Sequence, residues 1–348
     1  MKDQKYLEMA MDQAKKGLGQ TWQNPLVGAV IVKNDQVLAK GYHRRFGEKH
    51  AEIDAISHLK NEKEATGATI YVTLEPCSHQ GKTPPCVNKI IELGFKRVVI
   101  GQIDPNPQVS GKSVERMKQH GIQVTNLDNS KSLNPAYNFY FKNGRPLITL
   151  KYAMSLDGKI NQKSGYRTKL TGKYTFKDTQ KLRLMNQAIL IGENTLKIDD
   201  PKLTVRTNPL FPPYRVVLIH DSRELNLQQS IFKSEGPTYI LTNYKNEQHL
   251  PENVHVVVDE TWTPKKIIDF LTKQGIQSLL IEGGSHIHAD FVKSGLVDQL
   301  IAYVAPKLIG GSGLPSVFGQ GISEMLDFKI EKISQLGSDL KVFAKRVY

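Results

Sequence analysis

Cysteine is almost absent from this chain, which has two cysteines in 348 residues. Two cysteines cannot build the disulfide framework of a small secreted protein, so a reducing cytoplasm is the expected location. No run of about 18 apolar residues occurs, which argues against a membrane-spanning helix. The N-terminal stretch "MKDQKYLEMAMDQAKKG" alternates charged and apolar residues at helical spacing, a pattern that fits neither a signal peptide nor a transit peptide.

The chain also lacks a concentrated basic tract, although its net charge is +13. Dividing the sequence near residue 145 leaves a similar basic excess on each side. Nucleic-acid-binding proteins usually gather their basic residues on one face or in one segment. An even excess suits small phosphorylated substrates and anionic cofactors just as well, so charge alone does not decide between these partners.

Hydrophobic patterning predicts alternating strands and helices, and therefore an α/β fold. Residues 26–43 have the pattern of a β-hairpin, and the segments after it continue as α-β-α-β-α-β. The alternation stops in the aromatic- and Asn-rich stretch 134–146 and then resumes, so we expect one domain at 1–145 and another at 146–348. Among the elements that the patterning predicts are helices at 50–60 and 175–187 and strands at 188–196 and 299–310.

The two cysteines lie nine positions apart in "LEPCSHQGKTPPC", each directly after a proline. Together with His50, Cys77 and Cys86 offer three of the N and S ligands that tetrahedral zinc prefers, and the fourth position stays open for water. Glu52 follows the histidine by two residues, so it can move the proton of that water without binding the metal. Zinc deaminases carry this His-x-Glu and Pro-Cys signature, but their second cysteine comes three positions after the first. The intervening loop must therefore bring Cys86 back to the metal.

Plainer interpretations stay open at this point. Cytosolic cysteines are often only small buried residues, and a disulfide would also use both of them. A structural zinc site without chemistry would need a fourth protein ligand, for which His43 and His79 are candidates. A nucleic-acid base deaminase would share the zinc site, but no basic or aromatic tract for a strand accompanies it here.

Several long motifs resemble the bifunctional deaminase/reductase family of riboflavin biosynthesis. They are "NPLVGAVIV", "HAEIDAI", "YVTLEPCSHQGKTPPC" and "DPNPQVSGKS" in the first half, and "SLDGKI", "DDPKLTVR", "IEGGSHIHADF" and "YVAPKLIGG" in the second. The resemblance implies a cytidine-deaminase-like zinc domain followed by a dihydrofolate-reductase-like domain. The implied reactions are hydrolytic deamination of a diaminopyrimidinone with a phosphoribosylamino arm, then reduction of its ribosyl chain with NADPH. We therefore expect zinc and NADPH as cofactors, a phosphoribosylated pyrimidine as partner, no nucleic acid or membrane, and a homo-oligomer.

The resemblance further implies binding residues beyond Glu52 and the zinc ligands. The deaminase substrate would contact Asn24, Lys82, Asn106 and Ser110, and Glu75 would brace the loop or contact the substrate. The reductase substrate would contact Arg167, Arg183, Leu203, Arg206 and Glu282. The reductase cofactor would contact Ala153, Lys169, Thr195, Asp199, Ser222, Gly283, Gly284 and Ser285. Guanidinium groups suit a phosphate, and so does a helix that opens after two glycines. A turn, a solvated loop or a surface ion pair is the simpler explanation for each residue taken alone.

One stretch departs from the family pattern. Relatives carry Ser-x-Trp-Ile-Thr/Ser where this chain has residues 167–171, "RTKLT". The loss of the tryptophan removes a flat contact for the nicotinamide, while Arg167 and Lys169 add positive charge near phosphates. NADPH binding is therefore expected to depend on salt more strongly than in a tryptophan-bearing relative.

Overall fold

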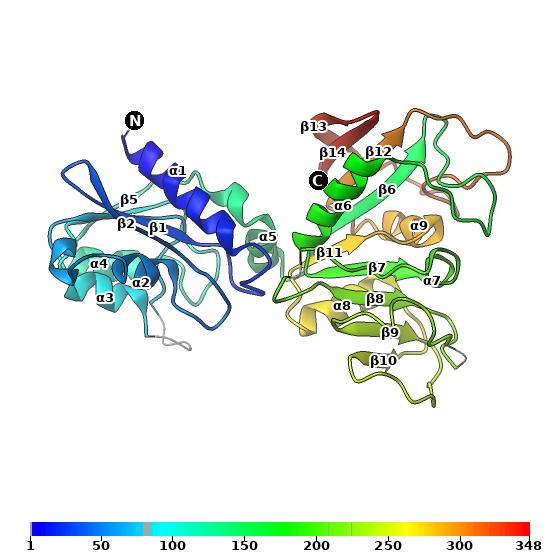
Figure 1. Cartoon of the computed structure of the whole chain (residues 1–348), viewed down its shortest axis with the longest axis horizontal. Coiled ribbons are helices and arrows are strands. Elements are labelled where there is room, and N and C mark those ends of the chain that lie inside the picture. Colours follow the sequence, from blue (N-terminus) through cyan, green and yellow to red (C-terminus); the bar gives the residue numbers. More distant parts are fainter. Residues whose placement is uncertain (1, 79–83, 208, 224) are drawn as a thin grey trace. The chain divides into compact units, whose positions relative to one another are not determined.

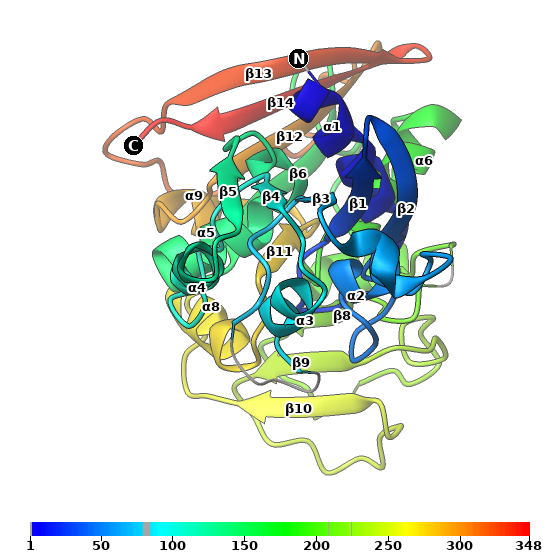
Figure 2. The ribbon, with the colours of Figure 1, turned by 90° about the vertical axis from the view of Figure 1, so that its left-hand side faces the viewer.

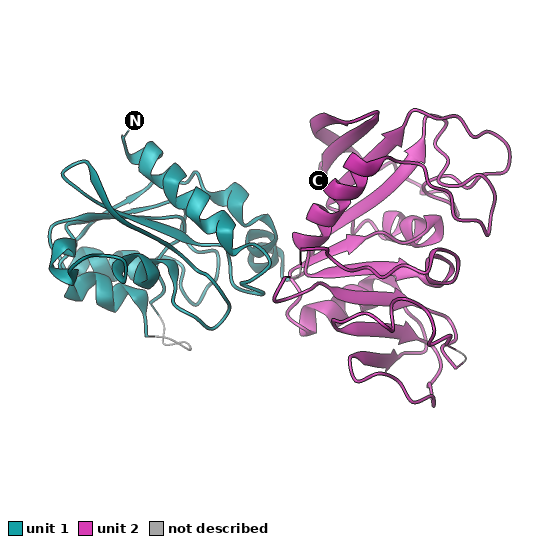
Figure 3. Ribbon diagram, viewed as in Figure 1, with its two compact units in different colours: residues 1–144 teal, residues 145–348 magenta. Residues whose placement is uncertain are grey.

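The computed structural model describes residues 2–78, 84–207, 209–223 and 225–348. The chain forms two compact units, residues 1–144 and 145–348 (Figure 3). Each unit has its own β-sheet with helices packed on it, so the α/β class expected from the patterning is confirmed. No helix within the described ranges combines the length and the apolar character needed to cross a bilayer.

The first unit is a five-stranded sheet between helices (Figure 1). Its elements are α1 (Lys2–Ala14), β1 (Gly28–Lys33), β2 (Gln36–Tyr42), α2 (Ala51–Ile56), β3 (Thr69–Val72), α3 (Cys86–Glu92), β4 (Arg97–Ile100), α4 (Lys112–Gln119), β5 (Gln123–Asn126) and α5 (Pro135–Asn143). The strand order is β2-β1-β3-β4-β5, and β3, β4 and β5 are parallel. α1 covers one face of this sheet, and α2, α3 and α4 cover the other.

Side chains of β1 alternate between the two faces of the sheet, as the period of a strand requires. Ala29 and Ile31 pack with α2, α3 and α4, whereas Val30 and Val32 pack with α1. β1 is antiparallel to both of its neighbours, β2 and β3, and is covered on both faces. This two-sided burial explains why its sequence is an unbroken apolar run.

The second unit is a nine-stranded sheet. Its elements are β6 (Leu147–Ser155), α6 (Lys173–Leu184), β7 (Ala188–Gly192), α7 (Glu193–Asp199), β8 (Tyr214–Leu218), β9 (Thr238–Thr242), β10 (Val254–Val258), α8 (Pro264–Lys273), β11 (Ser278–Ile281), α9 (Ser285–Lys293), β12 (Gln299–Ala305), β13 (Phe328–Leu336) and β14 (Asp339–Arg346). The order is β10-β9-β8-β7-β11-β6-β12-β14-β13. The strands from β10 to β12 are all parallel, so their carboxyl ends share one edge. Beyond β12, the sheet continues with β14 and β13, which form a long antiparallel hairpin (Figure 2).

Four expected elements end earlier than predicted. The helix expected at 175–187 spans Lys173–Leu184. The helix expected at 50–60 ends at Ile56, because the side chains of Ser57 and His58 both hydrogen-bond the Asp54 carbonyl oxygen and compete with helix continuation. The strand expected at 188–196 ends at Gly192, where α7 begins. The strand expected at 299–310 likewise ends at Ala305.

One further helix and one β-hairpin were not predicted at all. The aromatic stretch interpreted as irregular forms α5, which has Pro135 in its first turn and ends at Gly144 with φ of 67°. The β13–β14 hairpin also escaped prediction. β13 is an edge strand that exposes most of its side chains, so its sequence has no clear apolar face.

Asp298 connects the two ends of the second unit. Its buried carboxylate accepts hydrogen bonds from Nη1 and Nη2 of Arg145 at 2.8 and 2.7 Å, and from the Ile148 N–H at 2.8 Å. The hydroxyl of Tyr348 donates to the same carboxylate. The loop before β12 therefore holds both the segment that enters β6 and the segment that follows β14.

We expect Gly28→Ala to destabilise the first unit, because Gly28 lets α1 lie directly on β1. A Cβ on Gly28 would lie 2.0 Å from the Ala10 carbonyl oxygen, so α1 would have to move. The free energy of unfolding should fall by about 1–3 kcal/mol. Thermal unfolding followed by circular dichroism should show a lower midpoint, whereas Gly321→Ala, whose Cβ would meet no atom within 4 Å, should leave it unchanged. Equal midpoints for both variants would contradict this packing.

Candidate functional site

Three metal-ligating side chains meet at the carboxyl edge of the first sheet. His50 precedes α2, Cys77 follows β3 and Cys86 opens α3. Nδ1 of His50 lies 3.4 Å from each of the two Sγ atoms, and neither cysteine forms a disulfide. Tetrahedral zinc, with bonds of about 2.3 Å to sulfur and about 2.0 Å to nitrogen, holds N and S ligand atoms roughly 3.5 Å apart. The geometry of the three residues therefore fits a zinc ion.

Cys77 is prepared as a thiolate, the form that binds metal. Its pKa is lowered to about 4, first because the Cys86 thiol donates a hydrogen bond to it and also because His50 does. The backbone N–H of Cys86 donates to the same sulfur at 3.3 Å. The hydrogen bond to Cys77 in turn raises the pKa of His50.

Glu52 lies in the first turn of α2 with 3% of its surface exposed. Burial raises the pKa of Glu52 to about 7, although the neighbouring His50 opposes the shift. A carboxyl group whose pKa lies near neutrality can both accept and deliver a proton at that pH. The position suits general acid–base catalysis beside the metal.

His43, a possible fourth metal ligand, is engaged elsewhere. Its Nε2 lies 3.0 Å from Nδ2 of Asn24, and its Nδ1 lies 3.0 Å from the carbonyl oxygen of Lys49. Among the residues that the structure describes, the metal-binding set is therefore His50, Cys77 and Cys86 alone. The other candidate ligand, His79, and the predicted substrate residue Lys82 lie outside the described residues.

The loop between β4 and α4 carries the two other predicted substrate residues of this unit. Asn106 is half-buried, and its carbonyl oxygen accepts hydrogen bonds from the N–H groups of Val109 and Ser110 at 2.9 Å. Ser110 is exposed. Because β3 and β4 are adjacent and parallel, this loop begins beside the segment that carries Cys77.

A half-buried group of charges lies where β6, β11 and α6 meet in the second unit. Glu282 follows β11 directly and accepts hydrogen bonds from Nε and Nη2 of Arg183 at 2.8 and 2.9 Å. Nζ of Lys151, on β6, lies 3.9 Å from the same carboxylate. Burial alone would raise the pKa of Glu282, but the charges of Arg183 and Lys151 lower it to about 2.

Lys151 was not predicted as a site residue. It is a single lysine in an apolar strand, and that isolation is the only signal the sequence gives. Burial lowers the pKa of Lys151 below its ordinary value of 10.5, although the charge of Glu282 opposes the shift. The structure therefore adds a half-buried amine with a lowered pKa to the predicted residues Arg183 and Glu282.

Four of the predicted cofactor residues, Thr195, Gly283, Gly284 and Ser285, lie where α7 and α9 begin. Oγ1 of Thr195 accepts a hydrogen bond from the Gly284 N–H at 3.0 Å. A Cβ on Gly283 would lie 2.9 Å from the backbone nitrogen of Gly192, so only glycine fits there. Ser285 opens α9, and its buried hydroxyl has no hydrogen-bond partner among the described residues. Such a helix start suits a phosphate group.

Three of the remaining predicted residues, Asp199, Arg167 and Ala153, are linked to Lys151 by charge, through a hydrogen bond to Asp199 or by position on β6. Asp199 ends α7, and burial raises its pKa against the opposing charges of Arg167 and Lys151. Nη1 of Arg167 donates to the Asp199 carbonyl oxygen at 3.4 Å. Ala153 is half-buried on β6, two residues after Lys151 and on the same face of the strand.

Three other predicted residues, Leu203, Arg206 and Lys169, make their contacts away from the groups described above. The Leu203 side chain packs in a hydrophobic core with 3% exposed, so a substrate could meet only its backbone, which has φ of 51°. The guanidinium of Arg206 lies 4.8 Å over the ring of Phe176. Lys169 is exposed, and its carbonyl oxygen accepts a hydrogen bond from Lys307.

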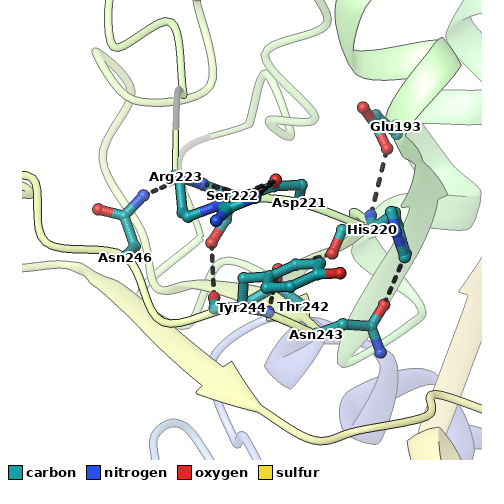
Figure 4. Close-up of polar contacts among 9 residues, drawn as sticks. All are labelled: Glu193, His220, Asp221, Ser222, Arg223, Thr242, Asn243, Tyr244 and Asn246. Atoms are coloured by element: carbon teal, nitrogen blue, oxygen red, sulfur yellow. Dashed lines mark hydrogen bonds and ion pairs between the residues drawn. The ribbon is translucent and has the colours of Figure 1, made fainter.

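Ser222 lies farther along the same sheet edge, in a polar group that follows β8 and β9 (Figure 4). Its hydroxyl donates to the carbonyl oxygen of Tyr244 at 3.2 Å. Arg223 pairs with Asp221 at 2.6 Å, and its guanidinium lies 4.5 Å over the Tyr244 ring. Nδ1 of His220 lies 3.0 Å from Oδ1 of Asn243. This group offers an exposed aromatic ring and positive charge to a ligand at the edge.

Comparison with known proteins gives a consistent result for both units. Residues 1–102 match the cytidine and deoxycytidylate deaminase zinc-binding region, and residues 146–342 match the RibD C-terminal domain. Riboflavin biosynthesis protein RibD from Aquifex aeolicus is 38% identical, with 99% of this chain and 98% of the relative covered. The Escherichia coli protein of the same name is 36% identical, with 98% of each covered. The solved structure of Acinetobacter baumannii RibD superimposes with a TM-score of 0.91 at 34% identity, covering 100% of this chain and 99% of that one. A diaminohydroxyphosphoribosylaminopyrimidine deaminase/5-amino-6-(5-phosphoribosylamino)uracil reductase from Thermotoga maritima gives the same TM-score and identity, with 99% of each covered.

We expect Cys86→Ser to lose zinc, because it removes one of three ligands that nothing else in the described site replaces. Loss of a residue that only hydrogen-bonds a metal ligand lowers metal affinity by up to about 100-fold, so loss of a ligand itself should lower zinc affinity by more than that. Metal analysis after dialysis against a weak chelator gives the measurement. His43→Gln is the matched control and should keep zinc near one per chain, because His43 contacts Asn24 and Lys49 instead. Equal zinc in both variants would contradict the ligand assignment.

Proposed function

The chain belongs to the RibD family of riboflavin biosynthesis proteins, and we propose which of its residues carry out each reaction. It is a bifunctional enzyme that uses zinc for deamination and NADPH for reduction. Residues 1–144 would deaminate a diaminopyrimidinone with a phosphoribosylamino arm, releasing ammonia. Residues 145–348 would then reduce its ribosyl chain to a ribityl chain. The observation that carries this assignment is the set His50, Cys77 and Cys86 with the buried carboxyl of Glu52 beside it.

In the deaminase unit, proton transfer falls to Glu52. Bound zinc supplies Lewis-acid activation of a water molecule at neutral pH. Glu52 accepts the proton of the attacking water, delivers it to the ring nitrogen and then helps ammonia to leave. Its pKa of about 7 suits both directions of this transfer. Asn24, held by His43, would orient the pyrimidine.

The phosphoribosyl arm would be bound by the β4–α4 loop. Asn106 and Ser110 lie on this loop, which begins beside the segment that carries Cys77. Lys82, outside the described residues, is proposed for the same arm on the family resemblance alone. These polar groups would hold the arm while the ring faces the metal.

In the reductase unit, NADPH supplies a hydride, and Lys151 supplies the proton that the opened ribose needs. Glu282 holds Lys151 in place at 3.9 Å and is itself fixed by Arg183. Arg183 already forms an ion pair with Glu282. We therefore assign binding of the substrate phosphate to the exposed guanidinium groups of Arg206 and Arg167.

The cofactor would lie along the carboxyl edge of the second sheet. We assign its phosphates to the start of α9, where Gly283, Gly284 and Ser285 lie next to Thr195. The polar group after β8 and β9, with Ser222, would receive the adenosine end. Lys169 and Asp199 are proposed near the nicotinamide on the family resemblance.

Cellular location and assembly are also proposed. We infer a cytoplasmic enzyme, because both cysteines are free thiols with a use as metal ligands. A homo-oligomer is supported by the exposed side chains of Ile330 and Ile333 on the edge strand β13.

Incubation with the phosphoribosylated diaminopyrimidine, zinc and NADPH tests the proposed function directly. Ammonia release and loss of reduced-nicotinamide absorbance are followed separately, because each reports one unit. Ammonia released from oligonucleotides but not from the free nucleotide would contradict it.

Glu52→Gln should keep zinc and lose deamination. Gln cannot accept the proton of water, and the ligand set is complete without it, so the rate should fall by about 10²-fold or more. Ammonia release and zinc content are measured on the same preparation. The exposed Glu48, changed to Gln, is the control and should retain both. Near-normal ammonia release from zinc-loaded Glu52→Gln would refute the proton-transfer role.

Lys151→Met should lose reduction while deamination continues. Removing the proton donor should slow reduction of the deaminated substrate by about 10²- to 10⁴-fold. In the unaltered enzyme, reduction needs the protonated amine, whose pKa is lowered, so the rate should fall as pH rises, with a midpoint below 10.5. Rates across pH are compared with those of Lys265→Met, an exposed residue on α8. A midpoint at or above 10.5, or normal reduction by Lys151→Met, would argue against this donor.

A further inference from the structure

The carboxylate of Glu75 has no catalytic assignment, yet it is one of the most fully bonded groups of the first unit. It is 3% exposed and lies two residues before the proposed zinc ligand Cys77. Four hydrogen bonds reach it, and all of them come from residues 104–113. A charged acceptor with this many donors fixes the segment that supplies them.

One oxygen of Glu75 holds both ends of the loop that carries Asn106 and Ser110. Oε2 accepts from the Asp104 N–H at 3.2 Å and from the Gly111 N–H at 2.9 Å. The loop therefore begins and ends at a single atom. Its beginning is fixed again where the Glu75 N–H donates to the Gln102 carbonyl oxygen at 3.0 Å.

The other oxygen of Glu75 caps α4. Oε1 accepts from the Ser113 N–H at 3.2 Å and from the Ser113 hydroxyl at 2.7 Å. α4 has no side-chain cap of its own, because Gly111 occupies the capping position with φ of 76°. Glu75 thus occupies the place that an anion would take at this helix start. Substrate binding is left to the side chains of the loop.

We propose that Glu75 is a positioning residue: it sets the loop 104–111 relative to the zinc ligand Cys77 and thereby governs recognition of the phosphorylated arm. The inference rests on the proposed function, in which Asn106 and Ser110 bind that arm. Among the described residues, the hydrogen bonds of the Glu75 carboxylate all go to residues 104–113 and none to Glu52 or the proposed zinc ligands. Its loss should weaken binding of the arm and spare the chemistry at the ring.

Glu75→Gln is the informative change because it keeps the size and removes half of the acceptor capacity. An amide offers one oxygen, and its nitrogen would face two of the four donors. The four donors cannot all be satisfied, so either the ends of the loop or the start of α4, which follows the loop directly, must shift. A shift of about 1 Å can cost up to about 10²-fold in reactions that depend on orientation.

The test compares two substrates on the zinc-loaded full chain. Deamination is measured with the phosphorylated diaminopyrimidine and with its dephosphorylated nucleoside. For Glu75→Gln we expect kcat/KM of the phosphorylated substrate to fall by roughly 10- to 100-fold, mainly through KM, and that of the nucleoside to change less than about threefold. Zinc content and the rate of reduction in the second unit should match the unaltered enzyme.

A second variant and a control variant accompany Glu75→Gln. Ser113→Ala removes one of the four hydrogen bonds and should give the same selective loss at smaller size, which also serves if Glu75→Gln does not fold. Glu92→Gln, an exposed glutamate on α3, should change nothing. Equal losses for both substrates, loss of zinc, or no loss in either Glu75→Gln or Ser113→Ala would overturn the proposal. Failure of the unaltered enzyme to release ammonia from the phosphorylated substrate would instead overturn the proposed function.

Discussion

Parallel strand pairing decides where both sites of this enzyme lie. In a parallel ladder all carboxyl ends reach the same edge, and the loops that follow them become neighbours in space. In the first unit this brings Cys77, after β3, beside the loop that follows β4. In the second unit it brings Glu282, after β11, beside the start of α7 after β7. Residues far apart in the chain meet because the backbone ladder brings their strand ends together.

The same low-dielectric interior gives buried acids different properties in the two units. Glu52 and Glu282 are both buried carboxyl groups, yet the pKa of Glu52 is raised to about 7 and that of Glu282 is lowered to about 2. Burial raises the pKa of both, so the difference comes from the charges beside Glu282, first the bidentate partner Arg183 and then Lys151. Glu52 can therefore carry a proton in its site, whereas Glu282 serves as a fixed negative charge beside Lys151 in the other.

What could be predicted from the sequence depended on how rare a residue's chemistry is in this chain. Two cysteines and one His-x-Glu limit the choices, so the zinc set could be proposed before any geometry was known. Lys151 could not, because an isolated lysine in an apolar strand is identical in sequence whether it points to solvent or into a site. Leu203 stays a prediction from the family pattern, and the structure adds that its side chain packs in the core, which leaves its backbone for a substrate contact. The β13–β14 hairpin escaped because an exposed edge strand has no apolar face to recognise.

The clamp at Asp298 has a consequence for how this architecture can be rearranged. Arg145 and Tyr348 both bond to that one carboxylate, so the second unit enters and leaves its fold at neighbouring points. A domain whose ends lie together can be moved within a gene, inserted into a host loop or circularly permuted with little strain on its sheet. Asp298 therefore marks the reductase as a portable module, and a short linker joining residues 348 and 145 would be enough to reopen the chain at another surface loop.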